Sequence, residues 1–185
     1  MTDDRAGVVI RLAVPDDAHG IALVHVRSWR ATYPGIVPQQ ILDRLSVDRR
    51  EAFWRETIVR SLDQATDVGE RVWVTEGPGG GIDGFASIGP TRDEDLPPKT
   101  GELFAIYLVR EAWSKGLGRR LLAAAVDDMA VRHDPLVLWV LTANDRARRF
   151  YEAAGWRGDG ASRTLDFDGT PIEEIRYRRA GGLAG

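Results

Sequence analysis

Apolar and polar residues follow one another along the chain with spacings that predict short strands and amphipathic helices. The first half opens with a β-type run that Pro15 ends, and two helical stretches come after it. Two alternating runs around a glycine-rich turn then predict a hairpin. In chain order we expect a strand over Val8–Val14, a helix capped by Asp16 or Asp17 and reaching about Thr32, a helical stretch from about Pro38 to Leu62 with a break near Ser46-Val47-Asp48, and strands over Arg71–Glu76 and Ile82–Ile88.

The second half of the chain contains two nearly continuous apolar runs, which are typical of buried strands. An amphipathic helix lies between them, and this succession predicts one parallel strand pair within an α/β or α+β fold. We expect a loop over Gly89–Thr100, strands over Glu102–Val109 and Leu136–Leu141, a helix whose apolar face is Leu117, Leu121, Leu122, Ala125 and Met129, a short helix from Asn144 to Ala154, and strands near Arg163–Phe167 and Ile172–Arg179.

Length and composition indicate one domain. The chain has 185 residues, 43% of them hydrophobic, which is enough for a sizeable core. We predict a single domain over residues 1–180 and a disordered tail over 181–185. The absence of cysteine excludes a disulfide scaffold and a thiolate nucleophile, and the three histidines have no metal-ligand spacing. We therefore expect no metal.

Charge and hydropathy bear on location and partners. The acidic N-terminus lacks the apolar core of a signal peptide, and no apolar run approaches the ~20 residues of a membrane span. We therefore expect a cytoplasmic protein that binds no membrane. Acidic residues outnumber basic ones by 28 to 25, so solvated helix faces explain the arginine clusters better than a nucleic-acid-binding surface does.

A glycine loop follows the first buried strand, with the sequence Trp113-Ser114-Lys115-Gly116-Leu117-Gly118. Free N–H groups and the dipole at a helix N-terminus favour an anion, and Lys115, Arg119 and Arg120 add positive charge. Gly-x-Gly alone is a weak signal, but its place between strand and helix predicts a pyrophosphate site. The missing Gly-Lys-Ser/Thr ending argues against an ATPase, and the lack of a third glycine argues against nicotinamide binding.

A second constellation joins Asn144 and Tyr151. They are seven residues apart, about two helical turns, so both project from one side of the short helix. Asn144 can be a helix N-cap and Tyr151 a core aromatic with a satisfied hydroxyl. The functional interpretation is that Asn144 anchors a ligand and Tyr151 donates a proton.

Together these motifs resemble the GNAT superfamily of acetyl-CoA-dependent N-acetyltransferases. The resemblance rests on ELFAIYLV, on Gly116-x-Gly118 at a helix start, and on LVLWVLTANDRARRFYEAAGW, and it covers nearly the whole chain. It implies a mixed, twisted central sheet of about seven strands, with flanking helices and a splayed, parallel fourth and fifth strand. It also implies acetyl-CoA as co-substrate, bound by Ile106, Tyr107 and Leu108, by the loop from Ser114 through Lys115, Gly116, Leu117 and Gly118 to Arg119, and by Asn144.

The same resemblance implies catalytic residues. Glu102 matches the glutamate base of histone-type members, while the other common base position holds Trp139; Glu102 can also be a solvated carboxylate at a strand end. Tyr151 would stand beside the sulfur. Arg110 stands where the family often has proline, and Trp113 stands where it often has glutamine or arginine. Neither departure removes a backbone donor.

The acceptor implied by the resemblance is a primary amine on a small molecule or a peptide, which attacks the thioester directly without a covalent enzyme intermediate. We expect its site between the first helices and the last hairpin, with Trp29, Tyr33 and Gln39 as candidate contacts, although Trp29 can equally be a core residue. A non-catalytic acetyl-CoA-binding module is the alternative function, and the chain can be a monomer or a homodimer.

Overall fold

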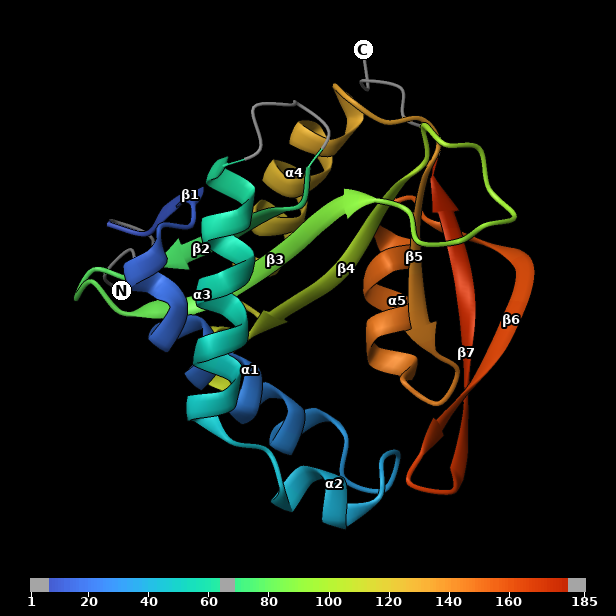
Figure 1. Ribbon diagram of the computed structural model, residues 1–185, viewed down its shortest axis with the longest axis horizontal. Coiled ribbons are helices and arrows are strands. Elements are labelled where there is room, and N and C mark those ends of the chain that lie inside the picture. The colour runs from blue at the N-terminus through green and yellow to red at the C-terminus, as the bar shows by residue number, and fades with distance from the viewer. Residues whose placement is uncertain (1–6, 64–68, 180–185) are drawn as a thin grey trace.

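The sheet places its strands in the order β1-β2-β3-β4-β5-β7-β6 (Figure 1). The computed structural model describes residues 7–63 and 69–179, so the predicted tail lies outside the described residues. Within that part of the chain the strands number seven, and only β4 and β5 pair in parallel. The strands are β1 (Val9–Leu12), β2 (Arg71–Glu76), β3 (Ile82–Pro90), β4 (Gly101–Leu108), β5 (Leu136–Leu141), β6 (Arg157–Phe167) and β7 (Thr170–Arg179).

Helices cover both faces of the sheet. Helices α1 (Ala18–Thr32) and α3 (Val47–Asp63) pack on one face against a core that includes Phe85. Helices α4 (Leu117–Ala130) and α5 (Asp145–Ala153) pack on the other face around Trp156. The short helix α2 (Gln39–Asp43) lies below α1 and faces the turn between β6 and β7 in Figure 1. Two 3₁₀ turns, Pro15–Asp17 and Arg110–Ala112, complete the set.

The predicted order of elements and the mixed α/β fold class are confirmed, and the main differences lie at element ends. The helical stretch after Pro38 breaks as expected, between α2 and α3. Strand β6 begins at Arg157, six residues before the predicted start. The prediction misses this segment because its polar sequence resembles a turn. That segment contains Gly160 with φ of 92° and a register shift between Gly158 and Ser162. An edge strand with one exposed side tolerates such an irregularity.

Strands β4 and β5 separate soon after they begin. Their ladder consists of three residue pairs and ends at Leu103↔Leu138. Next to that point β4 carries an extra residue: Ile88 of β3 pairs with Leu103 and Ser87 pairs with Ala105, which leaves Phe104 without a partner. A bulge bends its strand and increases the local twist. The remainder of β4, from Phe104 to Leu108, therefore leaves β5 and opens the splay that the family resemblance implies.

Candidate active site

A cavity of about 560 Å³ occupies the splay between β4 and β5. One wall is β4 from Leu103 to Leu108, and the opposite wall is β5 from Trp139 to Leu141. The end of α1, the loop before α4, the first turns of α5 and the β6–β7 hairpin also contribute side chains. The cavity is thus formed by elements that lie far apart in the sequence, and its length runs from a glycine loop to the hairpin.

The glycine loop gives one end of the cavity the character of an anion site. Gly116 caps α4 in the left-handed conformation, with φ of 77°, and no atom lies within 4 Å of a Cβ built there. Ser114 also has a positive φ, 61°. These two residues turn the chain so that α4 begins at the cavity, where its first N–H groups have no intrahelical acceptor. Arg119, on the first turn, lines the cavity.

Arg146 adds a second cation to the same end. It comes from α5, lines the cavity, and places its guanidinium 3.3 Å from the ring centre of Trp113. The Trp113 indole in turn donates to the carbonyl of Leu108 at 3.0 Å, which fixes the ring. Neither Arg119 nor Arg146 forms an ion pair with a carboxylate of the described residues, and burial lowers the pKa of Arg146. Both are therefore available to a phosphate.

Three phenols and an amide meet in the middle of the cavity. The hydroxyls of Tyr33 and Tyr107 lie 3.1 Å apart, and the Asn144 side chain is within hydrogen-bonding reach of Tyr33. Tyr151 also lines the cavity, and its hydroxyl makes no hydrogen bond to a described residue. Burial raises the pKa of all three phenols, so each remains protonated at neutral pH and can donate a hydrogen bond.

Asn144 is the helix N-cap that the sequence predicts, and its role as a ligand anchor stays a prediction. Its Oδ1 caps α5 by accepting from the N–H of Ala147 at 3.1 Å. The residue is 8% exposed and lines the cavity. Because the capping bond uses the oxygen, the amide NH₂ is the group that faces other partners, Tyr33 among them.

Comparison with known proteins agrees with this geometry. Residues 36–156, well over half of the 185-residue chain, match the family model "Acetyltransferase (GNAT) family". The chain belongs to the GNAT acetyltransferase family. A relative named uncharacterized N-acetyltransferase YuaI, from Bacillus subtilis, is 37% identical over 148 residues, which are 79% of this chain and 78% of YuaI.

Solved structures share the GNAT fold. The PaiA N-acetyltransferase of Thermoplasma acidophilum, solved with coenzyme A, has a TM-score of 0.72 at 20% identity, over 91% of this chain and 97% of its own. YncA of Salmonella typhimurium, solved with acetyl-CoA, has a TM-score of 0.68 at 23% identity, over 97% of both chains. At these identities the likeness concerns the fold.

Most of the site residues predicted for this GNAT acetyltransferase line one cavity. The cavity brings together Trp29, Tyr33, Ile106, Tyr107, Leu108, Ser114, Gly116, Gly118, Arg119, Asn144 and Tyr151. Lys115 and Leu117 belong to the same loop but are not among the lining residues, and Leu117 is buried in the core beneath α1. Gln39 is exposed and donates to Asp43 at 2.8 Å, away from the cavity wall.

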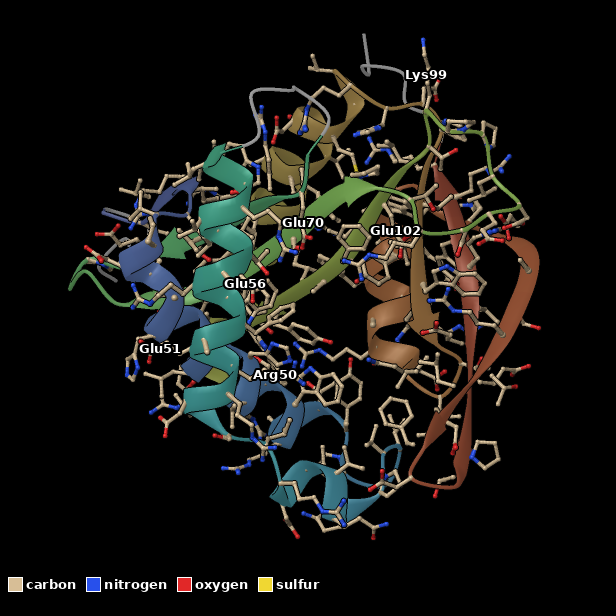
Figure 2. All side chains as sticks on the ribbon, viewed as in Figure 1. Arg50, Glu51, Glu56, Glu70, Lys99 and Glu102 are labelled. Carbon is tan, nitrogen blue, oxygen red and sulfur yellow. The ribbon has the colours of Figure 1, made fainter. Side chains whose placement is uncertain are left out.

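Glu102 also lies off the cavity wall. It is near the start of β4 (Figure 2), 6% exposed, and accepts hydrogen bonds from the N–H of Arg92 at 3.0 Å and the hydroxyl of Thr91 at 3.3 Å. Burial raises the pKa of its carboxyl, while the bond from Arg92 opposes that shift. Glu102 is therefore a buried carboxylate that holds the loop after β3, and its role as a base stays a prediction.

Sequence reasoning missed Arg146, Trp113 and Glu174 as site residues. In the sequence Trp113 stands out only as a departure from the family pattern, and Arg146 carries no signal beyond the neighbouring arginines Arg148 and Arg149. Glu174 lines the cavity from β7 and is 7% exposed. Its signal in the sequence is the alternation of Ile172, Glu174 and Arg176, which puts a carboxylate on the buried side of a strand.

The helices and the titratable side chains of the described residues also bear on membranes and metals. None of their helices has the length and apolarity of a membrane span. They also contain no group of three or more histidine, aspartate or glutamate side chains arranged to hold a metal ion.

Proposed function

We propose that this protein transfers an acetyl group from acetyl-CoA to a primary amine by direct attack of the amine on the thioester. The observation that carries the proposal is the continuity of the cavity, which joins an anion site at the α4 N-terminus to a cluster of phenols and then to the hairpin. An anion site, a narrow fork of free backbone groups and a hydroxyl donor suit the diphosphate, the amide-bearing arm and the sulfur of one extended molecule.

Each part of the proposed co-substrate has a counterpart along the cavity. The loop from Ser114 to Arg119 supports the pyrophosphate, with Arg146 as an additional phosphate partner. The edge of β4 from Phe104 to Leu108 lacks a β5 partner and offers backbone N–H and C=O groups to the amides of the arm. The Leu108 carbonyl is the exception, because it already accepts from Ser28 and Trp113. The Asn144 NH₂ supports the same arm. These backbone and side-chain groups are already in position before binding, which reduces the conformational entropy that is lost on association.

The protein's contribution to the chemistry is placement and hydrogen bonding. The co-substrate supplies an activated acyl carbon, so the protein needs no nucleophile of its own, in keeping with the absence of cysteine. A backbone N–H in the region Ile106–Leu108 stabilises the developing oxyanion. The Tyr151 hydroxyl donates to the departing sulfur. Because burial raises the pKa of Tyr151 while a thiol has a pKa near 8.5, hydrogen-bond donation suits this phenol better than full proton loss.

A base is required because an alkyl ammonium is not nucleophilic. An amine with a pKa near 10.4 is neutral in only about 1 molecule in 2,500 at pH 7, and a positioned base contributes ~10²–10⁴ in rate. Glu102 keeps this predicted role on the basis of its strand position and raised pKa, acting directly or through water. It also accepts hydrogen bonds from Thr91 and Arg92, which hold the loop after β3.

The test is calorimetry with acetyl-CoA, followed by release of free thiol across a panel of amines and mass spectrometry of the products. Binding together with an N-acetylated product is the expected result. Binding without thiol release for any amine would favour the non-catalytic acetyl-CoA-binding module. No binding of acetyl-CoA or of coenzyme A would refute the proposal.

A further inference from the structure

We propose that the Glu174 carboxylate is the acceptor subsite: it binds the ammonium group of the incoming amine and takes the first proton from it. This inference rests on the proposed acetyl transfer and adds to it the residue that recognises the acceptor and the charge that the acceptor carries. It also gives the proton-accepting role to β7 rather than to Glu102 on β4.

Strand register places Glu174 across the fork from the reacting region. Glu174 pairs with Leu141 of β5, and directly opposed residues of neighbouring strands point to the same face. Three residues beyond the last β4–β5 pair, Leu103↔Leu138, the two strands reach Ile106 and Leu141. Glu174 therefore faces the part of β4 that we assign to the thioester. In agreement with this, its negative charge raises the pKa of Tyr107, the next residue on β4.

Glu102 lies farther back on the same sheet. It pairs with Val137, which precedes Leu141 by four residues, or about 13 Å along β5. The splay has not yet opened at that level, because the ladder continues to Leu103. A carboxylate at the closed end is less accessible to an acceptor than one opposite the open edge of β4.

The electrostatics of the cavity favour a cation beside Glu174. Among the described residues that line it, Glu174 carries the only carboxylate, while Arg119 and Arg146 belong to the phosphate end. Its Oε1 accepts from Arg163 of β6, and its Oε2 has no hydrogen-bond partner among the described residues. Arg163 also pairs with Asp93 at 3.2 Å, so its positive charge is shared between two carboxylates. A buried carboxylate with one unpaired oxygen is a strong site for an ammonium donor.

Apolar side chains surround this carboxylate and restrict the acceptor. Leu141, Leu165 and Phe167 line the same part of the cavity, and the hairpin supplies the last two. An acceptor that fits has a cationic primary amine on an apolar carbon chain. A second carboxylate next to the amine would be repelled by Glu174, so an alkylamine or arylalkylamine is the favoured class over an acidic amino acid.

The proton balance is simple. The ammonium gives one proton to Glu174, which becomes a carboxylic acid and later releases that proton to solvent. The neutral nitrogen then forms its bond to the thioester carbon as the carbon–sulfur bond breaks. The nitrogen loses its second proton, which ends on the sulfur of the free thiol. The overall products are an N-substituted acetamide, the thiol and one proton.

A structural interpretation of Glu174 must be separated from this one, because Arg163 and Glu174 are direct cross-strand partners whose ion pair can simply hold the hairpin. Two variants break that pair differently. Glu174→Gln removes the charge from the cavity, whereas Arg163→Gln breaks the same pair and leaves the carboxylate in place. Glu173→Gln is the matched control, since Glu173 is the exposed neighbour on the opposite face of β7.

The experiment measures enzyme-dependent thiol release from acetyl-CoA, with the enzyme-free rate subtracted for each nucleophile. The nucleophiles are 2-phenylethylamine, which is cationic at neutral pH, and hydroxylamine, which is neutral there. We expect Glu174→Gln to lower kcat/KM for 2-phenylethylamine by about 10²-fold and to affect hydroxylamine far less. Arg163→Gln and Glu173→Gln should lower it much less than Glu174→Gln does. Calorimetry on each variant should give a Kd for acetyl-CoA close to that of the unmodified protein.

Three outcomes would overturn the inference. Equal losses with Glu174→Gln and Arg163→Gln would assign Glu174 to the hairpin. Equal losses with both nucleophiles would remove ammonium recognition. A larger loss with Glu102→Gln would return the proton-accepting role to β4. In each case the unmodified protein still releases thiol, whereas failure of the proposed function would be seen as no thiol release by the unmodified protein with any amine.

Discussion

Replacing Tyr151 by phenylalanine tests whether the cavity performs chemistry or only binds. The tyrosine is 8% exposed, packs against Phe150 and Trp156, and lies in the core shared by α4 and α5. Its hydroxyl makes no hydrogen bond to a described residue, so the substitution breaks no such bond in the folded protein. Phenylalanine preserves the ring contacts, and we therefore expect a free energy of unfolding within about 0.5 kcal/mol of the original.

The effect on the reaction follows from the charge that develops on sulfur. Hydrogen bonds to charged groups contribute about 1.5–3 kcal/mol. If Tyr151 makes such a bond only as the thiolate departs, its loss lowers kcat by about 10- to 160-fold, since about 1.4 kcal/mol corresponds to tenfold in rate. The thioester sulfur of the ground state is a weak acceptor, so the Kd for acetyl-CoA should change far less than kcat.

The assay compares steady-state thiol release with calorimetric binding, with thermal unfolding as the check on folding. An unchanged kcat, or a Kd that rises by the same factor as kcat falls, would show that Tyr151 is a core aromatic whose hydroxyl has no part in the transition state. A fall in unfolding temperature of several degrees would mean that the hydroxyl has a structural partner.

Three further predictions concern other charged groups. Glu102→Gln should lower kcat at neutral pH with recovery at higher pH if Glu102 is the base, and an unchanged pH–rate profile would remove it from the mechanism. Because burial raises the pKa of Glu102, its ionisation opposes folding as pH rises. By urea titration, the stability of the variant relative to the unmodified protein should therefore be greater at pH 7 than at pH 4. Arg146→Gln should weaken acetyl-CoA binding about 10-fold by calorimetry, more at low salt than at high salt. Arg60→Gln, at an exposed arginine on α3 away from the cavity, should not weaken it, and equal effects of the two variants would deny Arg146 a phosphate contact. Burial, with a smaller contribution from the charge of Arg50, lowers the pKa of His25 from 6.5 to about 3. The free energy of unfolding should therefore fall by up to about 1.4 kcal/mol per pH unit as pH drops below 6.5. A His25→Gln variant that keeps this slope in urea titrations would contradict the assignment.

Local sequence was sufficient for the order of elements and for one end of the site. Apolar runs as short as Leu136–Leu141, with flanking polar residues, are typical of a buried strand, and Gly116 before an amphipathic helix favours the left-handed turn seen there. Asn144 and Tyr151 share a helix, so their spacing alone places both on one side. These predictions depend on neighbours within about two helical turns, and the structure agrees with them.

What the tertiary structure decided is which distant side chains share the cavity. Period-two alternation assigns Glu102 and Glu174 to a face of their strands, but it does not say which strand lies alongside or where the loop after β3 packs. The β5–β7 register and the early end of the β4–β5 ladder bring Glu174 to the open part of the fork and leave Glu102 at its closed end. The positions of these two carboxylates depend on how the whole sheet twists and pairs. That arrangement is a global free-energy minimum, which no short stretch of the chain encodes.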